Sequence, residues 1–273
     1  MCRYLFTAPL TAVALLLTGC AGLPATEAGR LDERRIEFAR LGQGTPAVVF
    51  ENGLGAPMRS WNKVFPEIAR HTAVFAYHRP GYGNSDPAAT PRDGVHIVDE
   101  LRALLRSRGF APPYVLVGHS LGGLYMQLYA RKYPDEVAGL VLVDSTHPTQ
   151  MEGAGRLDNQ PWWVRMFFPL FVHGEQRREF DAAPATGEEV LRLPTVTGKP
   201  VRVLAAIDNS RAAVVQHANR KRADFARLYP DSRVQWVESG HFIQWDKPQV
   251  VIDAIRETLA ESTPKNPEWR DSK

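Results

Sequence analysis

Short apolar runs alternate along the chain with longer stretches in which apolar residues recur at helical spacing. Beyond the second run, the short runs are almost continuously apolar, which is typical of parallel strands that are buried on both faces. Such an alternation of strands and helices predicts a mostly parallel central sheet with helices on both faces. Strands are predicted at 35–40, 47–51, 73–77, 114–117, 140–143, 201–207 and 234–237, and helices at 61–70, 94–108, 121–133 and 249–260.

The alternation is interrupted after Asp144 by the segment 146–199, in which no clear strand can be recognised. An insertion of that length indicates a functional lid rather than a structureless loop. Within it, the segment 161–171 contains five aromatic residues. These either pack inside the lid or line a pocket for an apolar group of a substrate. The charged segment 175–181 is predicted to form the solvent-exposed face of the lid.

The sequence Gly-His-Ser-Leu-Gly-Gly at 118–123 lies between a predicted strand and a predicted helix. A strand, a sharp turn that carries a serine, and a helix form the context of a nucleophile elbow, whose strained turn requires small neighbours. Glycine and serine are also common in loops, so a tight structural turn is the alternative. The context favours Ser120 as a catalytic nucleophile.

A serine hydroxyl needs a general base, because it is a poor nucleophile at neutral pH. His241 follows the last predicted strand and precedes the closing helix, which places it on a loop at the strand ends, where the Ser120 hydroxyl is expected to emerge. A third residue, an acid, must hold the imidazole in the right tautomer. Asp144 and Asp208 each follow a predicted strand. We favour Asp144 and keep Asp208 as the alternative acid, while a capping or turn role is the alternative for either.

The first residues are typical of an export signal, with a positive charge at Arg3 and an apolar stretch at 5–17 that is too short to span a bilayer. The stretch ends in Leu-Thr-Gly-Cys at 17–20, which resembles a bacterial lipobox. Cleavage there would leave Cys20 as the lipid-modified first residue of the mature protein. The alternative is an ordinary signal peptide in which Cys20 has no role.

The lipobox predicts a signal peptide at 1–19 and a tether at 20–33, and the polar residues at 262–273 predict a terminal tail. The protein is then expected to be exported and attached to the bacterial cell envelope by a lipid anchor, without a membrane-spanning helix. Because Ala21 provides no retention signal of the aspartate type, an outer-membrane or periplasmic location is favoured.

The composition predicts a single globular domain at 34–261, since 44% of residues are hydrophobic and 23% are charged. The formal net charge of +3 is small and the basic residues are scattered, which argues against nucleic acid as a partner. The other cysteine, Cys2, lies within the predicted signal peptide, so the mature chain would contain no internal disulfide. The sequence does not indicate an oligomeric state.

Four motifs, in order along 35–260, resemble those of the α/β-hydrolase fold family. Besides the elbow, Glu-Asn-Gly-Leu-Gly at 51–55 resembles the oxyanion loop, His-Arg-Pro-Gly-Tyr-Gly-Asn-Ser-Asp at 78–86 the arginine-centred turn, and Ser-Gly-His-Phe at 239–242 the catalytic-histidine loop. The resemblance implies an α/β-hydrolase fold with a helical lid inserted after the sixth strand of the family's sheet.

Stabilisation of an oxyanion needs two backbone N–H donors. Leu121, directly after the nucleophile, is expected to supply one donor. The resemblance implies that Leu54 supplies the other, with Gly53 and Gly55 allowing the backbone to approach a ligand closely. Asn52 stands where the family usually has histidine, which affects the bracing of this loop more than the main-chain donor.

These features predict a serine hydrolase that cleaves a carboxylic ester or related acyl compound with an apolar group, through an acyl-enzyme and without a cofactor or a metal. The serine at the elbow argues against epoxide hydrolases and haloalkane dehalogenases, which the family resemblance associates with aspartate there. The alternatives on the same fold are a C–C bond hydrolase, an amidase and a cofactor-free haloperoxidase. An alternative from another class is a non-catalytic relative that binds a ligand.

Overall fold

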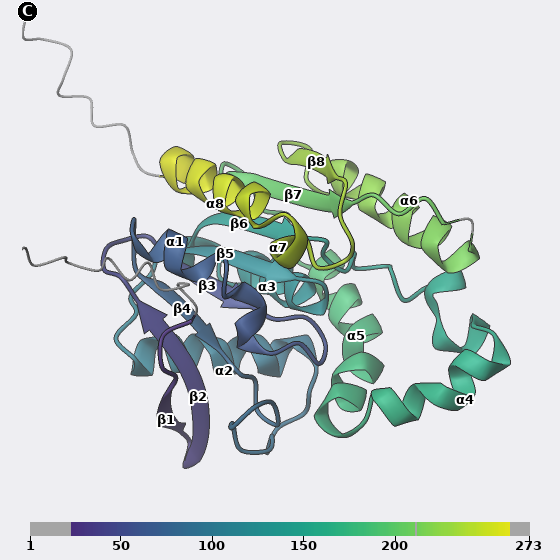
Figure 1. The fold of residues 1–273 in the computed structure, drawn as a ribbon, viewed down its shortest axis with the longest axis horizontal. Helices are drawn as coiled ribbons and strands as arrows, with labels where there is room; N and C mark the ends of the chain where they lie inside the picture. The colour runs from purple at the N-terminus through teal and green to yellow at the C-terminus, as the bar shows by residue number, and fades with distance from the viewer. Residues whose placement is uncertain (1–22, 211, 263–273) are drawn as a thin grey trace, which may run out of the picture.

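A central eight-stranded sheet organises the molecule in the computed structural model, which describes residues 23–210 and 212–262 (Figure 1). The strand order is β1-β2-β4-β3-β5-β6-β7-β8. From β4 to β8 all neighbouring strands pair in parallel, whereas β2 runs antiparallel to β1 and β4. The strands are β1 (Glu27–Leu31), β2 (Arg34–Leu41), β3 (Ala47–Glu51), β4 (Val74–Tyr77), β5 (Tyr114–His119), β6 (Val137–Val143), β7 (Val201–Ala206) and β8 (Arg233–Val237).

Helices cover both faces of the sheet, as the alternating pattern predicts. The core on one face includes side chains from α1, α7 and α8, and the core on the other includes side chains from α2, α3, α5 and α6. In β5, Val115 and Val117 face the first core, while Tyr114 and Leu116 face the second. The helices are α1 (Phe65–Ala69), α2 (Gly94–Ser107), α3 (Leu121–Lys132), α4 (Trp162–Phe171), α5 (Gly174–Arg192), α6 (Ala213–Leu228), α7 (Ile243–Asp246) and α8 (Pro248–Ser262), with short 3₁₀ turns η1 (Met58–Trp61), η2 (Pro134–Glu136), η3 (Gly153–Gly155) and η4 (Leu157–Asn159).

The segment between β6 and β7 is helical, as expected for a lid. Its long helix, α5, lies against α3 and α2, whereas α4 stands at the outer edge of the molecule (Figure 1). No side chain of α4 is buried. The lid is therefore fixed to the body mainly through α5.

Several elements differ from the sequence prediction. The expected tether at 20–33 contributes β1, because Glu27–Leu31 pairs antiparallel with β2. The predicted helix at 61–70 is divided into η1 and α1. The helix α6, which the sequence did not predict, follows β7. The signal peptide and most of the polar tail lie outside the described residues.

Because β3, β5, β6 and β7 are parallel, their carboxyl ends lie at one edge of the sheet. The loops after these strands carry Asn52, Ser120, Asp144 and Asp208, in that order. The fold therefore gathers the candidate residues at one edge, and their side-chain contacts decide which of them act together.

Candidate active site

Ser120 occupies the sharp turn between β5 and α3. Its backbone has φ 52° and ψ −124°, a conformation that is strained for any residue with a side chain. The flanking glycines make this turn possible. A Cβ atom on Gly118 would lie 2.6 Å from the Cα of Gly123, and one on Gly122 would lie 2.4 Å from the carbonyl oxygen of Asn52.

A chain of two hydrogen bonds connects Ser120, His241 and Asp144. The Nε2 atom of His241 lies 3.0 Å from the Oγ atom of Ser120, and its Nδ1 atom lies 2.6 Å from Oδ2 of Asp144. Since an ionised carboxylate can only accept, Nδ1 carries the proton and Nε2 is left to accept the serine hydroxyl. The His241 side chain is 47% exposed, whereas that of Asp144 is fully buried.

Asp144 is held by groups from three other segments. Its Oδ1 atom accepts hydrogen bonds from the amide of Ala206 at 3.1 Å and from Nε of Arg222 at 2.7 Å. Its Oδ2 atom accepts from Nη2 of Arg222 at 2.8 Å in addition to His241. Burial alone would raise the pKa of Asp144, but the hydrogen bonds from His241 and Arg222 outweigh it and lower that pKa to about 2. The carboxylate is therefore ionised at neutral pH.

Asp208, the alternative acid, makes a local turn. Its carboxylate accepts a hydrogen bond from the amide of Ser210 at 2.9 Å, and its carbonyl accepts one from the side chain of Asn219 at 2.7 Å. The side chain that reaches His241 is therefore that of Asp144.

The loop after β3 lies directly against the elbow. A Cβ atom on Gly53 would come within 3.0 Å of Nδ1 of His119 and 3.1 Å of Cβ of Ser120. Leu54 follows Gly53, and Leu121 is the first residue of α3, where the N–H group has no partner within a helix. Both expected oxyanion donors thus lie on segments that flank Ser120.

Asn52 braces this loop in place of the histidine that the family resemblance leads one to expect. Its Nδ2 atom donates to the carbonyl of Tyr77 at 2.8 Å, and its Oδ1 atom accepts from the indole of Trp61 at 2.9 Å. The Asn52 side chain is buried. The loop is therefore tied to β4 and η1.

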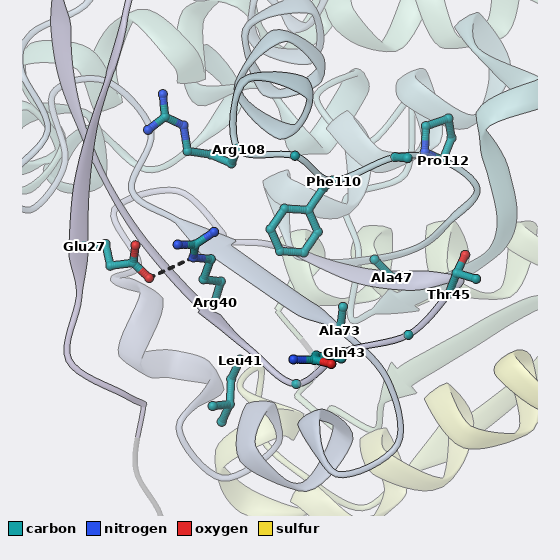
Figure 2. Close-up of a pocket in the computed structure, with 14 residues that line it drawn as sticks. Glu27, Arg40, Leu41, Gln43, Thr45, Ala47, Ala73, Arg108, Phe110 and Pro112 are labelled. Carbon is teal, nitrogen blue, oxygen red and sulfur yellow. Dashed lines mark hydrogen bonds and ion pairs between the residues drawn. The ribbon is translucent and has the colours of Figure 1, made fainter.

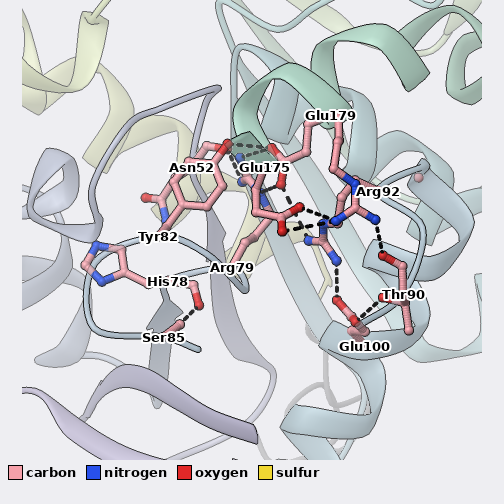
Figure 3. A network of polar contacts seen from close by, with 12 residues as sticks. Asn52, His78, Arg79, Tyr82, Ser85, Thr90, Arg92, Glu100, Glu175 and Glu179 are labelled. Carbon is pink, nitrogen blue, oxygen red and sulfur yellow. Dashed lines mark hydrogen bonds and ion pairs between the residues drawn. The ribbon is translucent and has the colours of Figure 1, made fainter. Parts of the chain in front are cut away.

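A buried ionic network joins the same loop to the lid (Figure 3). Arg79 donates to the carbonyls of Asn52 and Gly53 at 2.7 and 3.1 Å. It also binds Glu51 at 2.6 Å and forms a two-pronged pair with Glu179 of α5, at 2.9 and 2.8 Å. The position of α5 and that of the loop after β3 are thus both tied to one guanidinium group.

Glu179 is a correction to the sequence analysis, which placed 175–181 on the solvent-exposed face of the lid. Its side chain is fully buried. Its carboxylate pairs with Arg79 and accepts a hydrogen bond of 2.7 Å from the hydroxyl of Tyr82. One of its oxygens also lies 3.5 Å from Nη2 of Arg92. Isolated charges are rarely buried, so only the presence of these partners, distant in sequence, explains the position of Glu179.

His119 binds the loop that carries His241. Its Nε2 atom donates to the carbonyl of His241 at 2.9 Å, and its ring packs against those of His241 and Phe242. Burial, together with the nearby His241, lowers the pKa of His119 to about 3. The ring is therefore neutral at physiological pH.

An open apolar pocket of about 400 Å³ lies between α4, α5 and α6. Val164 and Phe168 of α4, which are one helical turn apart, line it together with Phe180 and Val214. Trp162 and Phe171, in contrast, are 70% and 76% exposed. The segment 161–171 therefore has one side that lines the pocket, with Val164 and Phe168, and another side that is exposed, with Trp162 and Phe171.

A second cavity, of about 770 Å³, lies away from Ser120 (Figure 2). It includes Ala47, Ala73 and Pro112, at the starts of β3, β4 and β5, and so belongs to the opposite edge of the sheet. Arg40 lines it but is paired with Glu27 at 2.9 Å.

Within residues 23–210 and 212–262, no cluster of three or more histidine, cysteine, aspartate or glutamate residues could hold a metal ion. In the same part of the chain, no helix combines the length and apolar character needed to cross a bilayer.

Residues 46–215 match the family model of the alpha/beta hydrolase fold. Among curated relatives, an uncharacterized Bacillus subtilis protein, YbdG, is 27% identical over 65% of this chain and 55% of its own length. A human (lyso)-N-acylphosphatidylethanolamine lipase is 30% identical over 44% of this chain and 36% of its own. The chain spans less than two thirds of the length of these relatives.

Solved structures extend the similarity over most of the chain. A putative lipase from Acinetobacter baumannii has a TM-score of 0.61 at 20% identity, covering 89% of this chain and 92% of its own. Est816, described as an N-acyl homoserine lactone degrading enzyme, has a TM-score of 0.65 at 17% identity, covering 85% and 99%. At these identities the similarity establishes the shared fold.

Proposed function

The chain belongs to the α/β hydrolase fold family, and on that premise we propose that it is a serine hydrolase that cleaves a carboxylic ester or related acyl compound. The observation that carries the proposal is the pair of hydrogen bonds, 3.0 and 2.6 Å long, that links Ser120 to His241 and His241 to Asp144. A nucleophile, a base and an orienting acid in this geometry are the requirements of acyl transfer.

In the proposed reaction, Oγ of Ser120 attacks the carbonyl carbon of the ester while Nε2 of His241 takes the hydroxyl proton. The N–H groups of Leu54 and Leu121 stabilise the oxyanion that forms. When the C–O bond breaks, His241 gives its proton to the leaving alcohol and an acyl-Ser120 remains. Water, deprotonated by His241, then attacks the acyl carbon. As the bond between this carbon and Oγ breaks, His241 returns the proton to Oγ, which releases the carboxylic acid and restores Ser120.

The apolar pocket under α4 supports an apolar acyl or alcohol group in the substrate. The names of two similar proteins, the human lipase and the putative Acinetobacter lipase, point to the same class of substrate. Neither name determines the substrate of this chain, and a panel of nitrophenyl esters and amides of increasing acyl length would define it.

Fluorophosphonate labelling tests the proposal, because these reagents bond covalently to activated serines. The wild type should be labelled and should hydrolyse at least one ester of the panel. Ser120→Ala should lose labelling, and both Ser120→Ala and His241→Ala should lose turnover by roughly 10⁴- to 10⁶-fold, since members of a triad act as a unit. Ser107→Ala, at the exposed end of α2, is the matched control. Hydrolysis retained by Ser120→Ala would refute the proposal.

We also infer that Cys20 carries a lipid that attaches the protein to the cell envelope. The support is the lipobox-like sequence at 17–20. Cys20 lies outside the described residues, so the inference depends on the sequence alone.

A further inference from the structure

We propose that Arg222 of α6 is a positioning residue that fixes the carboxylate of Asp144 and, through it, the orientation of the His241 imidazole. The proposal rests on the proposed function of the Ser120 site. It assigns a role to a side chain that neither the sequence motifs nor the hydrolytic reaction itself requires.

The contact between Arg222 and Asp144 is a two-pronged, largely buried ion pair. Nε binds Oδ1 at 2.7 Å and Nη2 binds Oδ2 at 2.8 Å. The Arg222 side chain is 14% exposed and that of Asp144 is fully buried. Two parallel hydrogen bonds of this kind fix the plane of a carboxylate as well as its position.

Arg222 is itself held in place. Its Nη1 atom donates to Oδ1 of Asn219 at 2.8 Å, and Nδ2 of Asn219 donates to the carbonyl of Asp208 at 2.7 Å. The guanidinium is thereby tied to the loop that follows β7. In this chain Asp208 thus contributes to the environment of Asp144 through its backbone, and the carboxylate that meets His241 belongs to Asp144.

The face of α6 that carries Arg222 also lies against the lid. Val214 and Ala218, at successive turns before Arg222, line the apolar pocket. His217 bonds to the carbonyl of Gln150 at 3.0 Å. Positions 214, 218 and 222 form one stripe along the helix, so the helix surface that meets the pocket continues to the carboxylate of Asp144.

Arg222 and His241 bind the same oxygen atom. Oδ2 of Asp144 accepts hydrogen bonds from both side chains, so the guanidinium fixes the atom that orients the imidazole. Without Arg222, the carboxylate would be free to rotate, and the hydrogen bond from Nδ1 of His241 would lose its fixed direction.

The test compares two substitutions at Arg222 with one at Arg227, an exposed residue of the same helix that pairs with Asp224. For each variant kcat and KM are measured on one ester. The NMR resonance of the His241 Nδ1 proton, which reports its hydrogen bond to Asp144 and requires no turnover, is recorded in parallel. Arg222→Gln should displace this resonance and lower kcat by about tenfold with KM nearly unchanged, because a misplaced base slows the chemical step more than it weakens substrate binding. Arg222→Lys should lower kcat less, because the charge remains although the two-pronged geometry is lost.

Arg227→Gln should leave kcat, KM and the Nδ1 resonance unchanged. A purely structural role of Arg222 would lower thermal stability without displacing the resonance, and an Arg222→Gln variant with the wild-type resonance would overturn the proposal. If Arg222→Gln fails to fold, Arg222→Lys decides: a kcat equal to that of the wild type refutes the positioning role. Absence of fluorophosphonate labelling in the wild type would refute the proposed function instead, and the Nδ1 resonance would still test the role of Arg222.

Discussion

Asp144 accepts four hydrogen bonds, although orienting a histidine requires only one. Its backbone has φ 40°, an uncommon conformation for a residue other than glycine. A strained backbone position persists only where its surroundings hold it, and here a backbone amide, an arginine and a histidine all bind the same carboxylate. At the residue scale the site is therefore defined by how this one side chain is held.

This arrangement predicts that Asp144 and Asp208 differ sharply in their effect on catalysis. Asp144→Asn should lower kcat by about 10⁴-fold, as loss of the acid does in serine proteases, because the imidazole can then adopt the wrong tautomer. Asp208→Asn should leave kcat within a small factor of the wild type and cost about 1 kcal/mol of stability at most, through a weakened turn. Both are measured on one fixed ester, with folding checked by circular dichroism. The reverse ranking would assign the acid to Asp208.

The sequence could reveal a site residue only where the residues that identify it are close to it along the chain. Ser120 is marked by its immediate neighbours, and His241 by its place between a strand and a helix. Arg222 and Glu179 were missed because their partners lie 78 and 100 residues away. A charged side chain on an amphipathic helix normally faces solvent, and nothing local distinguishes one that binds a buried partner.

At the scale of elements, α4 has two distinct faces. Val164 and Phe168 face the pocket, and the rings of Phe168 and Phe180 lie 4.7 Å apart between their centroids. The outward face carries Trp162 and Phe171. The sequence showed that aromatic residues are concentrated here but left open whether they pack in the lid or contact substrate, because a helix that is apolar on all sides has no preferred orientation.

The two faces predict a difference between Phe168 and Phe171. Phe168→Ala should enlarge the pocket and raise KM for long-chain nitrophenyl esters by about tenfold, while acetyl esters are unaffected, because only a long chain reaches the lost ring. Phe171→Ala, the matched control on the same helix, should change neither. Steady-state kinetics over a series of acyl lengths makes the comparison. Equal effects of the two substitutions would exclude the pocket as the acyl-binding site.

The elements that the sequence analysis located correctly are those with strong internal patterns. The central strands are almost uniformly apolar, α2 has a clear apolar face, and α3 is bounded by the serine turn and Pro134, so their positions followed from local pattern alone. The strand β1 was missed because its residues are mostly exposed, and α6 because only His217 and Phe225 are buried along it. Both elements depend on what packs against them, which a weak local pattern cannot reveal.

At the scale of the whole molecule, the candidate site lies at the carboxyl edge of the parallel strands. Leu23, the first described residue, packs on the core that includes α1 and α8. Only two residues separate Leu23 from Cys20. A lipid on Cys20 would therefore hold the folded domain close to a membrane surface.

The anchor can be tested with the two cysteines of the chain. In a bacterial host supplied with a fatty acid that carries a chemical tag, the wild type should incorporate the tag and partition into the detergent phase, because more than one acyl chain gives stable membrane attachment. Cys20→Ser should lose the tag. Cys2→Ser, which changes the same chemistry within the predicted signal peptide, should behave as the wild type. Mass spectrometry of the mature N-terminus then identifies the modified residue. Density-gradient fractionation should place the protein with the outer membrane, because Ala21 provides no retention signal. An unmodified Cys20 at that N-terminus would contradict the anchor and favour simple secretion.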